Sequence, residues 1–201
     1  MEIRTTDTNE PIDPLPFYKD RIADHIAPRA THIMIYGAED EGKGTFAGKS
    51  KEVKEVDGKI IVPCQLSLIN CITAWGRIAT GISANDYMDG TSNNYVVRYV
   101  RLYVDNRLVS SSDVDRFAFD ENRLINSWTD YAEQRRSGRW YMCAPIAENN
   151  DLRMLSADEQ RGWVTIAALL MGSGYSSSIA ARLPNSHVTS KPKASNQAST
   201  R

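Results

Sequence analysis

The clearest strand signal in the chain is an alternation of apolar and polar positions between residues 72 and 84. Successive side chains of a β-strand point to opposite faces of a sheet, so the even-numbered residues here can reach one core together. Gly76 and Gly81 interrupt the pattern and permit a bulge or a bend. We therefore predict a long strand whose apolar face carries Ile72, Ala74, Ile78, Ile82 and Ala84.

A second alternation predicts a β-hairpin over residues 95–112. Its first half is made of Tyr95, Val96, Tyr99, Val100, Arg101, Leu102, Tyr103 and Val104. Asp105 and Asn106 then interrupt the pattern before apolar residues return at Leu108 and Val109. Asp and Asn tolerate the left-handed backbone that a two-residue hairpin turn requires. We therefore place the turn at Asp105-Asn106.

Shorter patterns supply the remaining elements. Residues 31–36 predict the first strand of the body, and the charged, glycine-rich residues 37–59 predict a loop. Within that stretch, Asp57-Gly58 is a plausible hairpin turn before a strand at 59–62. Leu124, Ile125 and Trp128 stand at helical spacing and predict a short helical segment near 120–134. Residues 140–143 and 163–166 predict two more strands. Together these short strands predict an all-β chain, an antiparallel β-sandwich of the immunoglobulin-like type.

Composition divides the 201 residues into three parts. Residues 1–30 contain Pro11, Pro14, Pro16 and Pro28, a density that denies a continuous helix or central strand, so this part is predicted to be a linker. Residues 31–171 form the predicted sandwich domain. Residues 172–201 are rich in serine and have no acidic residue, and they offer too little apolar surface to offset the entropy of ordering. We therefore predict a disordered tail.

Charge and cysteine content narrow the classes of partner. The net charge is −1, which gives no general electrostatic case for binding nucleic acid or an anionic membrane. No window reaches the roughly 18 apolar residues that a membrane span needs. Three cysteines are an odd number, so they imply no complete disulfide framework. Cys64 and Cys71 could pair, but buried free thiols are the more frequent outcome.

The motifs of a catalytic centre are absent from the sequence. The three histidines, His25, His32 and His187, show none of the spacings of a zinc site, and there is no G-x-S-x-G nucleophile motif. Gly42-Lys43-Gly44-Thr45 has only part of the glycine spacing of a phosphate-binding loop. A flexible hairpin loop explains it better. We therefore expect no cofactor in this chain.

The loop that follows residue 85 has two interpretations. Asp86, Asp89 and Asn93 concentrate oxygen ligands suited to calcium, although the EF-hand pattern fails at Met88 and Gly90. Turns in which Asp and Asn side chains bond their own backbone explain the same residues without a metal. The turn interpretation is favoured, and the calcium interpretation stays open.

Two further groups of residues could have either a functional or a purely structural role. A mixed-charge stretch could do acid–base work, but an arginine stands close to each acid and a salt-bridged corner is favoured. It consists of Asp113, Asp115, Arg116, Asp120, Glu121 and Arg123. A set of aromatic residues could line a platform for a glycan or a peptide, or cover the second face of the sheet. It consists of Tyr99, Tyr103, Trp128 and Trp140.

Several segments together resemble a known family. They read Trp75-Gly76-Arg77-Ile78, Asn85-Asp86-Tyr87-Met88-Asp89-Gly90, Leu102-Tyr103-Val104-Asp105, Asp115-Arg116-Phe117-Ala118-Phe119-Asp120-Glu121, Asn126-Ser127 and Asp130-Tyr131. Their order and spacing resemble the β-sandwich domain that follows the catalytic domain in a set of bacterial lysostaphin-like (LytM-type) zinc metallopeptidases. An ordered set of segments is more specific than any single short motif.

The opening of the chain is similar to another part of that family. There, the catalytic domain ends in a strand reading roughly H-L-H-F-E-I-R, whose second histidine binds zinc. This chain opens Met1-Glu2-Ile3-Arg4, and residues 9–14 look like the family's linker out of that strand. The resemblance implies that the chain begins just past the zinc motif. Beyond residue 166 the composition departs from the family pattern, and a truncated or frame-shifted reading frame would explain both ends.

The resemblance implies a role without catalysis. Zinc is expected only in the missing catalytic domain, so hydrolysis of peptidoglycan is not expected of this chain. It would be a fragment of a cell-wall metalloendopeptidase, an accessory region with peptidoglycan or a cell-envelope protein as partner. The alternative is a standalone binding or scaffold module of the cell envelope. The family is periplasmic or in the envelope, whereas this sequence shows no export signal and would be cytoplasmic if made as written.

Overall fold

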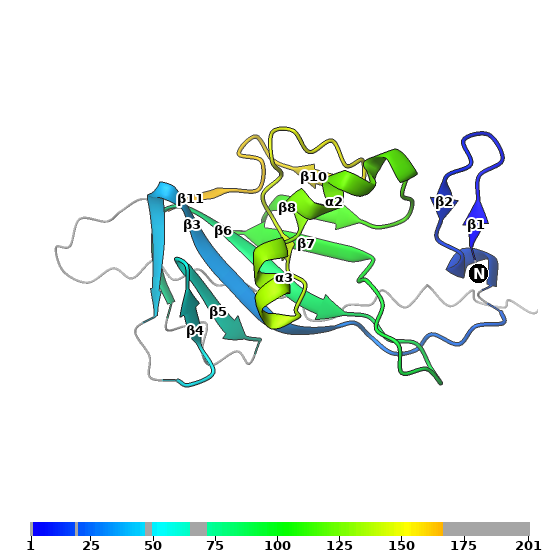
Figure 1. Ribbon diagram of the computed structural model, residues 1–201, viewed down its shortest axis with the longest axis horizontal. Helices are drawn as coiled ribbons and strands as arrows, with labels where there is room; N and C mark the ends of the chain where they lie inside the picture. The colour runs from blue at the N-terminus through cyan, green and yellow to red at the C-terminus, as the bar shows by residue number, and fades with distance from the viewer. Residues whose placement is uncertain (1, 19, 47–49, 65–71, 167–201) are drawn as a thin grey trace, which may run out of the picture.

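The computed structural model describes residues 2–18, 20–46, 50–64 and 72–166, which form three antiparallel sheets and a few short helices (Figure 1). The elements are β1 (Ile3–Arg4), β2 (Pro11–Ile12), α1 (Leu15–Tyr18), β3 (Arg29–Phe46), β4 (Lys54–Val56), β5 (Lys59–Pro63), β6 (Ile72–Asn85), β7 (Tyr99–Val104), β8 (Arg107–Asp113), η2 (Phe119–Leu124), α2 (Ile125–Trp128), α3 (Tyr131–Ser137), β9 (Met142–Cys143), β10 (Leu155–Ala157) and β11 (Val164–Ile166). The predicted antiparallel, mostly β class is confirmed.

The largest sheet has the strand order β11-β6-β3-β5-β4, and β9 also pairs with β6. Its central pair, β3 and β6, is matched from Arg29 opposite Asn85 to Phe46 opposite Ile72. Two irregularities interrupt this pairing, one between Ala30 and His32 and one between Gly37 and Gly42. Bulges increase the local twist and bend of a strand. The sheet curls into a half-barrel, and β4 and β5 lie at the end of the molecule opposite β1 and β2 (Figure 1).

The prediction of a loop over residues 37–59 is wrong for its first part, because β3 continues to Phe46, and also for residues 54–56, which form β4. The glycines of this part allow close backbone approach within the sheet rather than a flexible loop. A Cβ on Gly37 would lie 1.7 Å from the carbonyl oxygen of Gly42, and a Cβ on Gly76 would lie 2.0 Å from that of Glu41. Local composition therefore signalled a loop where non-local pairing selects a bulged strand.

The second sheet has the order β10-β8-β7 and contains the predicted hairpin. Asp105 and Asn106 both have positive φ, 49° and 62°, as a two-residue turn of this kind requires. Regular pairing begins at Tyr99, opposite Asp113, whereas Tyr95 forms an isolated bridge with Asp86. The turn at Asp57-Gly58 between β4 and β5 is confirmed in the same way, with φ of 50° and 72°.

Two apolar clusters share the long strand β6. The first joins Ile72, Ala74 and Ile78 to β3 and β5, and the second joins Ile82 and Ala84 to Trp128 and the three-stranded sheet. The expectation of one common core is therefore corrected. A strand of 14 residues spans roughly 46 Å at about 3.3 Å per residue, which exceeds the width of one core.

The predicted helical segment near 120–134 is confirmed as three short pieces, η2, α2 and α3. Asp130 caps α3 by accepting a hydrogen bond from the backbone N–H of Glu133 at 2.9 Å, and it pairs with Lys59 on β5. Gly138 ends the helix in the left-handed conformation. Because Lys59 and Asp130 are both largely buried, this ion pair fixes α3 against the large sheet.

The predicted linker, residues 1–30, includes a small hairpin of its own, β1 and β2, which are two residues each. Contacts tie this hairpin to the body. The backbone N–H of Asp13 donates to the carbonyl oxygen of Asp115 at 2.8 Å, and Glu10 pairs with Arg153 at 2.6 Å. The predicted tail, residues 172–201, lies outside the described residues, as do the last residues of the predicted sandwich, 167–171.

Candidate binding surface

The hairpin β7–β8 presents one exposed face, which we call the outer face. It consists of Tyr99, Arg101 and Tyr103 on β7 with Leu108, Ser111 and Asp113 opposite them on β8. Along β7 these three residues are exposed, and the residues between them are half-buried. The alternation that predicted the strand therefore also separates its two faces. Tyr99 and Tyr103 stand four residues apart, which is roughly 13 Å along a strand.

Two guanidinium groups lie beside the Tyr99 ring. The Cζ atoms of Arg98 and Arg101 are 5.0 Å and 5.7 Å from its centroid, within the range of a cation–π interaction. Tyr99 as a whole remains 51% exposed, so these arginines orient the residue without covering it. A flat aromatic surface with a positive charge at its border is the result.

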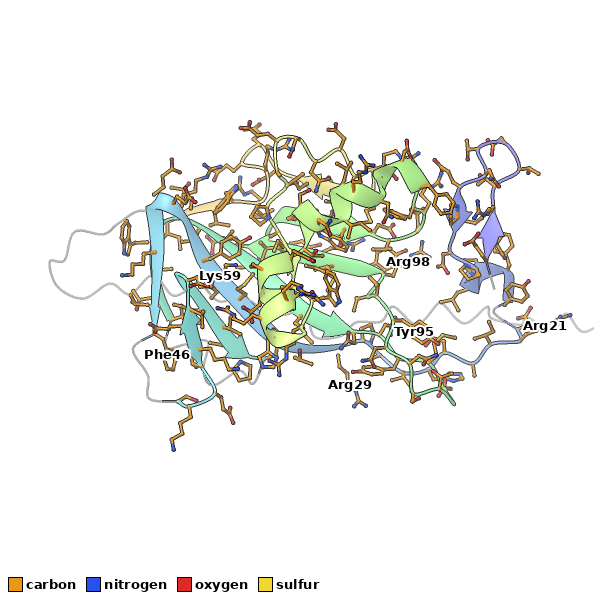
Figure 2. The ribbon with its side chains drawn as sticks, viewed as in Figure 1. Arg21, Arg29, Phe46, Lys59, Tyr95 and Arg98 are labelled. Carbon is orange, nitrogen blue, oxygen red and sulfur yellow. The ribbon has the colours of Figure 1, made fainter. Side chains whose placement is uncertain are left out.

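Arg98 is held in place by two carboxylates. It pairs with Asp13 of the amino-terminal segment and, at 3.3 Å, with Asp113 of β8. Figure 2 shows Arg98 at the end of the hairpin sheet that faces the amino-terminal residues. Burial alone would lower the pKa of the Arg98 guanidinium, but Tyr99, Asp13 and Asp113 outweigh it and raise the pKa. Arg98 is therefore a fixed cation, whereas Arg101 keeps an exposed side chain.

Strand β7 also lies at the edge of its sheet. In the strand order β10-β8-β7, the described residues place no strand beyond β7. An edge strand presents unpaired backbone N–H and C=O groups to its surroundings. The outer face thus combines aromatic rings, guanidinium groups and main-chain hydrogen-bonding groups, all of which can bind a ligand.

The aromatic residues of the predicted platform separate into two groups. Tyr99 and Tyr103 lie together on the outer face, and Trp140 is exposed beside β9. Trp128 is buried at 6% exposure in the second apolar cluster, so it belongs to the core rather than to a platform. Helical spacing with Leu124 and Ile125 was the sequence signal for this burial.

In the loop that was considered as a calcium site, the carboxylates of Asp86 and Asp89 already accept hydrogen bonds from other residues. Asp86 accepts a hydrogen bond from the backbone N–H of Tyr87 at 2.9 Å, an interaction of the turn type. Asp89 Oδ2 lies 2.8 Å from the backbone nitrogen and 2.9 Å from Nδ1 of His25. These hydrogen bonds from His25 lower the pKa of Asp89, and burial raises that of Asp86. Asn93 is exposed. Asp86 therefore makes a local contact of the predicted kind, whereas Asp89 is bound by His25, 64 positions away, rather than by its own turn.

Most carboxylates of the mixed-charge stretch have arginine partners. Asp113 pairs with Arg98 at 3.3 Å, Asp115 with Arg116 at 3.5 Å, and Glu121 with Arg153 at 2.8 Å. Hydrogen bonds from Arg153 hold the pKa of Glu121 below its ordinary value. The stretch therefore forms a salt-bridged corner. Two of the three arginines come from outside the stretch, which local sequence did not indicate.

Histidine and cysteine geometry gives no metal centre within the described residues, where no group of three His, Cys, Asp or Glu side chains could hold an ion. Burial lowers the pKa of His32 on β3 and raises the pKa of the Cys64 and Cys143 thiols to about 11. Thiols with such pKa values are poor nucleophiles. His187 and Cys71 lie outside the described residues. Likewise, none of the described helices is long and apolar enough to cross a membrane.

Comparison of the chain with protein families, with curated proteins and with solved structures gives no significant match. The outer face must therefore be interpreted from its own chemistry. Sequence reasoning found Tyr99 and Tyr103 but missed Arg98 and Arg101 as their companions. The alternation along β7 could have revealed Arg101, because it places Arg101 on the same face as Tyr99 and Tyr103. For Arg98 the decisive partner, Asp13, lies 85 positions away, so no local pattern could reveal it.

Proposed function

We propose that this chain is a non-catalytic accessory region of a cell-wall metalloendopeptidase, and that its outer face binds peptidoglycan. The resemblance to lysostaphin-like metallopeptidases suggests the polymer. The observation that carries the proposal is the exposed row of Tyr99, Arg101 and Tyr103 on an edge strand. The binding role requires neither zinc nor a nucleophile from this chain.

The chemistry of the outer face suits a glycan that carries peptides. Aromatic side chains offer apolar faces that can pack against sugar rings, and the hydroxyl of each tyrosine remains available for hydrogen bonds. A guanidinium group binds a carboxylate through two parallel hydrogen bonds, so Arg101 would select the acidic groups of a peptide. Spacing of roughly 13 Å between the two rings lets a polymer contact both at once.

A binding assay with purified peptidoglycan sacculi tests the proposal. We expect the wild-type chain to co-sediment with sacculi, and Tyr99→Ala to reduce the affinity about tenfold, the cost of losing one central anchor. Arg101→Lys keeps the charge but loses the planar fork, so it should weaken binding while alanine at this position weakens it further.

Tyr131→Ala is the matched control, because Tyr131 is equally exposed but lies on α3, outside the outer face. It should bind sacculi as the wild type does. Absence of binding by the wild-type chain, or equal losses in the Tyr99 and Tyr131 variants, would show that the outer face does not recognise peptidoglycan.

The same proposal includes a finer description of the fold, an immunoglobulin-like β-sandwich. Its support is the contact of the three-stranded sheet with β6, where Val100 and Leu155 join Ile82 in one apolar cluster. In β-sandwiches, side chains from the inner faces of the two sheets interdigitate in this way to form the core. A crystal structure in which the two sheets do not pack face to face would contradict the sandwich description. The binding role would still be tested separately by the sacculus assay.

A further inference from the structure

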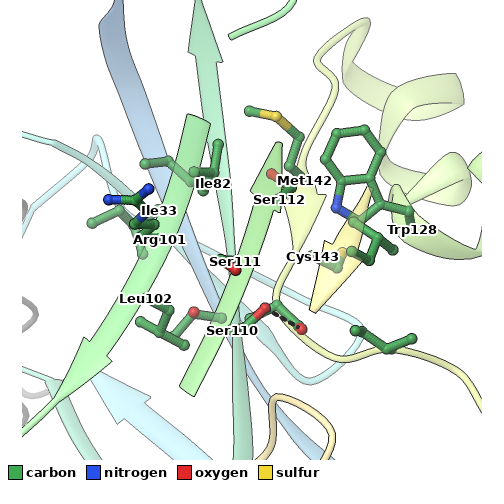
Figure 3. Close-up of a pocket in the computed structure, with 15 residues that line it drawn as sticks. Ile33, Ile82, Arg101, Leu102, Ser110, Ser111, Ser112, Trp128, Met142 and Cys143 are labelled. Carbon is green, nitrogen blue, oxygen red and sulfur yellow. Dashed lines mark hydrogen bonds between the residues drawn. The ribbon is translucent and has the colours of Figure 1, made fainter. Parts of the chain in front are cut away.

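A cavity of about 80 Å³ lies between the three-stranded sheet and the large sheet, on the side opposite the outer face (Figure 3). Strands β7 and β8 line one wall, and β3, β6 and β9 line the other, with Trp128 beside them. Arg101 and Ser111 belong both to the outer face and to the lining, but the proposal above uses the exposed side of the hairpin and not this space.

Two serines on β8 explain why the cavity exists. Ser110 and Ser112 pair with Leu102 and Val100, so all four side chains point toward the large sheet. Sheets that face each other stand about 10 Å apart, a distance that large apolar side chains normally fill. Serine is too short to meet Ile33 and Ile82 across this gap. The cavity therefore follows from the sequence of one strand.

The two hydroxyl groups differ in their partners. Ser110 Oγ donates to the carbonyl oxygen of Ala144 at 2.8 Å, the dashed contact in Figure 3. Ser112 is 5% exposed, and its Oγ has no hydrogen-bond partner among the described residues. Buried hydroxyl groups in proteins almost always have a partner, because an unpaired one loses its hydrogen bonds to water. Ser112 thus provides an unused donor and acceptor at the wall of an apolar space.

The lining also limits the charge of an occupant. Among the described residues that line it, Arg101 alone is charged, and this residue is exposed on the edge strand. Burial raises the pKa of the Cys143 thiol to about 11, so this group is neutral at pH 7. A charged ligand would find no buried partner here and would lose its hydration.

We propose that this cavity binds a small neutral molecule with an apolar body and one hydroxyl or carbonyl group, which hydrogen-bonds to Ser112 Oγ. A water molecule needs only about 10–15 Å³ of such space, whereas an engineered apolar cavity of about 150 Å³ holds benzene. The present volume lies between them and suits a short branched alcohol. The alcohol would satisfy Ser112 and place its methyl groups against Ile33, Ile82 and Met142.

Titration of the full chain with isopropanol, followed by NMR of its methyl groups, tests the proposal, and xenon serves as an apolar probe that cannot hydrogen-bond. We expect saturable isopropanol binding with the largest shifts at Ile33, Ile82 and Met142. Ser112→Ala should weaken isopropanol at least about fivefold, the effect of losing one hydrogen bond, but leave xenon binding intact. Ser156→Ala is the matched control, because Ser156 is an exposed serine on β10, away from the lining, and should change neither probe.

Two results would overturn the proposal. One is an absence of saturable binding of isopropanol by the wild type, which is also expected if a trapped water already satisfies Ser112. The other is an equal loss of isopropanol and xenon in Ser112→Ala, which would mean that the hydroxyl does not contact the ligand. The Ser112→Ala substitution changes none of the side chains assigned to the outer face, so failure of these experiments is distinct from failure to bind sacculi.

Discussion

At the scale of single residues, Glu121 connects three parts of the chain. Its Oε2 accepts a hydrogen bond from the backbone N–H of Ala118 at 3.0 Å, which holds the start of η2. Its Oε1 accepts from Arg153 Nε at 2.8 Å, and Arg153 also contacts Glu10 of the amino-terminal segment. One largely buried carboxylate thus organises contacts that are far apart in sequence.

This arrangement makes stability depend on pH. Hydrogen bonds from Arg153 depress the pKa of Glu121 from 4.5, so the charged form is favoured in the folded state. Its contribution is complete above pH 4.5 and is lost as the pH falls through the lower folded value. We expect Glu121→Gln to be less stable than the wild type at pH 7, with the difference shrinking below pH 4.5. Urea unfolding at several pH values measures this, and a difference independent of pH would contradict it.

The two tryptophans Trp128 and Trp140 provide a second residue-scale prediction. Trp128 is 6% exposed and Trp140 is 49% exposed, although the sequence placed both in one candidate platform. Trp128→Ala should lower the free energy of unfolding by about 3–5 kcal/mol, because it leaves a cavity among Met142, Leu152 and Met154. Trp140→Ala should change it by less than about 0.5 kcal/mol. Chemical denaturation of both variants checks the contrast; similar losses would place Trp140 in the core.

At the scale of elements, local signals were sufficient for the hairpins. Asp105-Asn106 and Asp57-Gly58 identify turns because the required positive φ restricts the residues that can stand there. The continuation of β3 through residues 37–46 was not predictable, because the close approaches at its glycines involve non-local partners: backbone of β3 and β6 at Gly37 and Gly42, and the side chain of Ile60 on β5 at Gly44. For the binding surface, the alternation along the strand was enough to identify Tyr99 and Tyr103 as candidates. The pairing of Arg98 with Asp13 is non-local, so no local pattern predicts it.

Glycine can be required at a position because φ is positive or because a Cβ would collide with a neighbour, and Gly58 and Gly76 allow the two reasons to be compared. Gly58 and Gly76 have φ of 72° and 73°, but a Cβ on Gly58 would meet nothing within 4 Å. Gly58→Ala should therefore cost only the backbone strain, about 1–2 kcal/mol. Gly76→Ala adds a collision with the backbone of Glu41 and should cost at least about 2 kcal/mol more than the first variant. Thermal and urea unfolding compare them, and equal costs would show that β3 and β6 can separate at the bulge.

At the scale of the whole molecule, the sheets differ greatly in how they are supported. Strands β3, β5 and β6 carry fully buried residues, including Met34, Val62 and Ala79. The hairpin of β1 and β2 has only two paired residues in each strand. Its links to the body include Asp13, Glu10, an isolated bridge at Ile12, and Arg4, whose Cζ lies 4.7 Å from the centroid of the Phe119 ring. Cooperative stability is therefore expected to concentrate in the large sheet.

Hydrogen exchange measures this distribution. Amides of β3 and β6 should exchange only through global unfolding, whereas those of β1 and β2 should exchange through local opening and be the fastest among the strands. Arg153→Ala should accelerate exchange in β1 and β2 and leave β3 and β6 nearly unchanged. Uniform protection across all strands would mean that the amino-terminal hairpin unfolds together with the body.

The long pairing of β3 with β6 also has a consequence for the order of folding. Phe46 and Ile72 at one end are 26 positions apart, whereas Arg29 and Asn85 at the other end are 56 apart. Closing the longer loop first costs roughly 0.6 kcal/mol more free energy, because more chain entropy is lost. Nucleation is therefore favoured at the end near Phe46. The two strands then join progressively toward Arg29. Substitutions near Thr45 and Thr73 should therefore slow folding, while those near Ala30 and Ala84 should mainly accelerate unfolding.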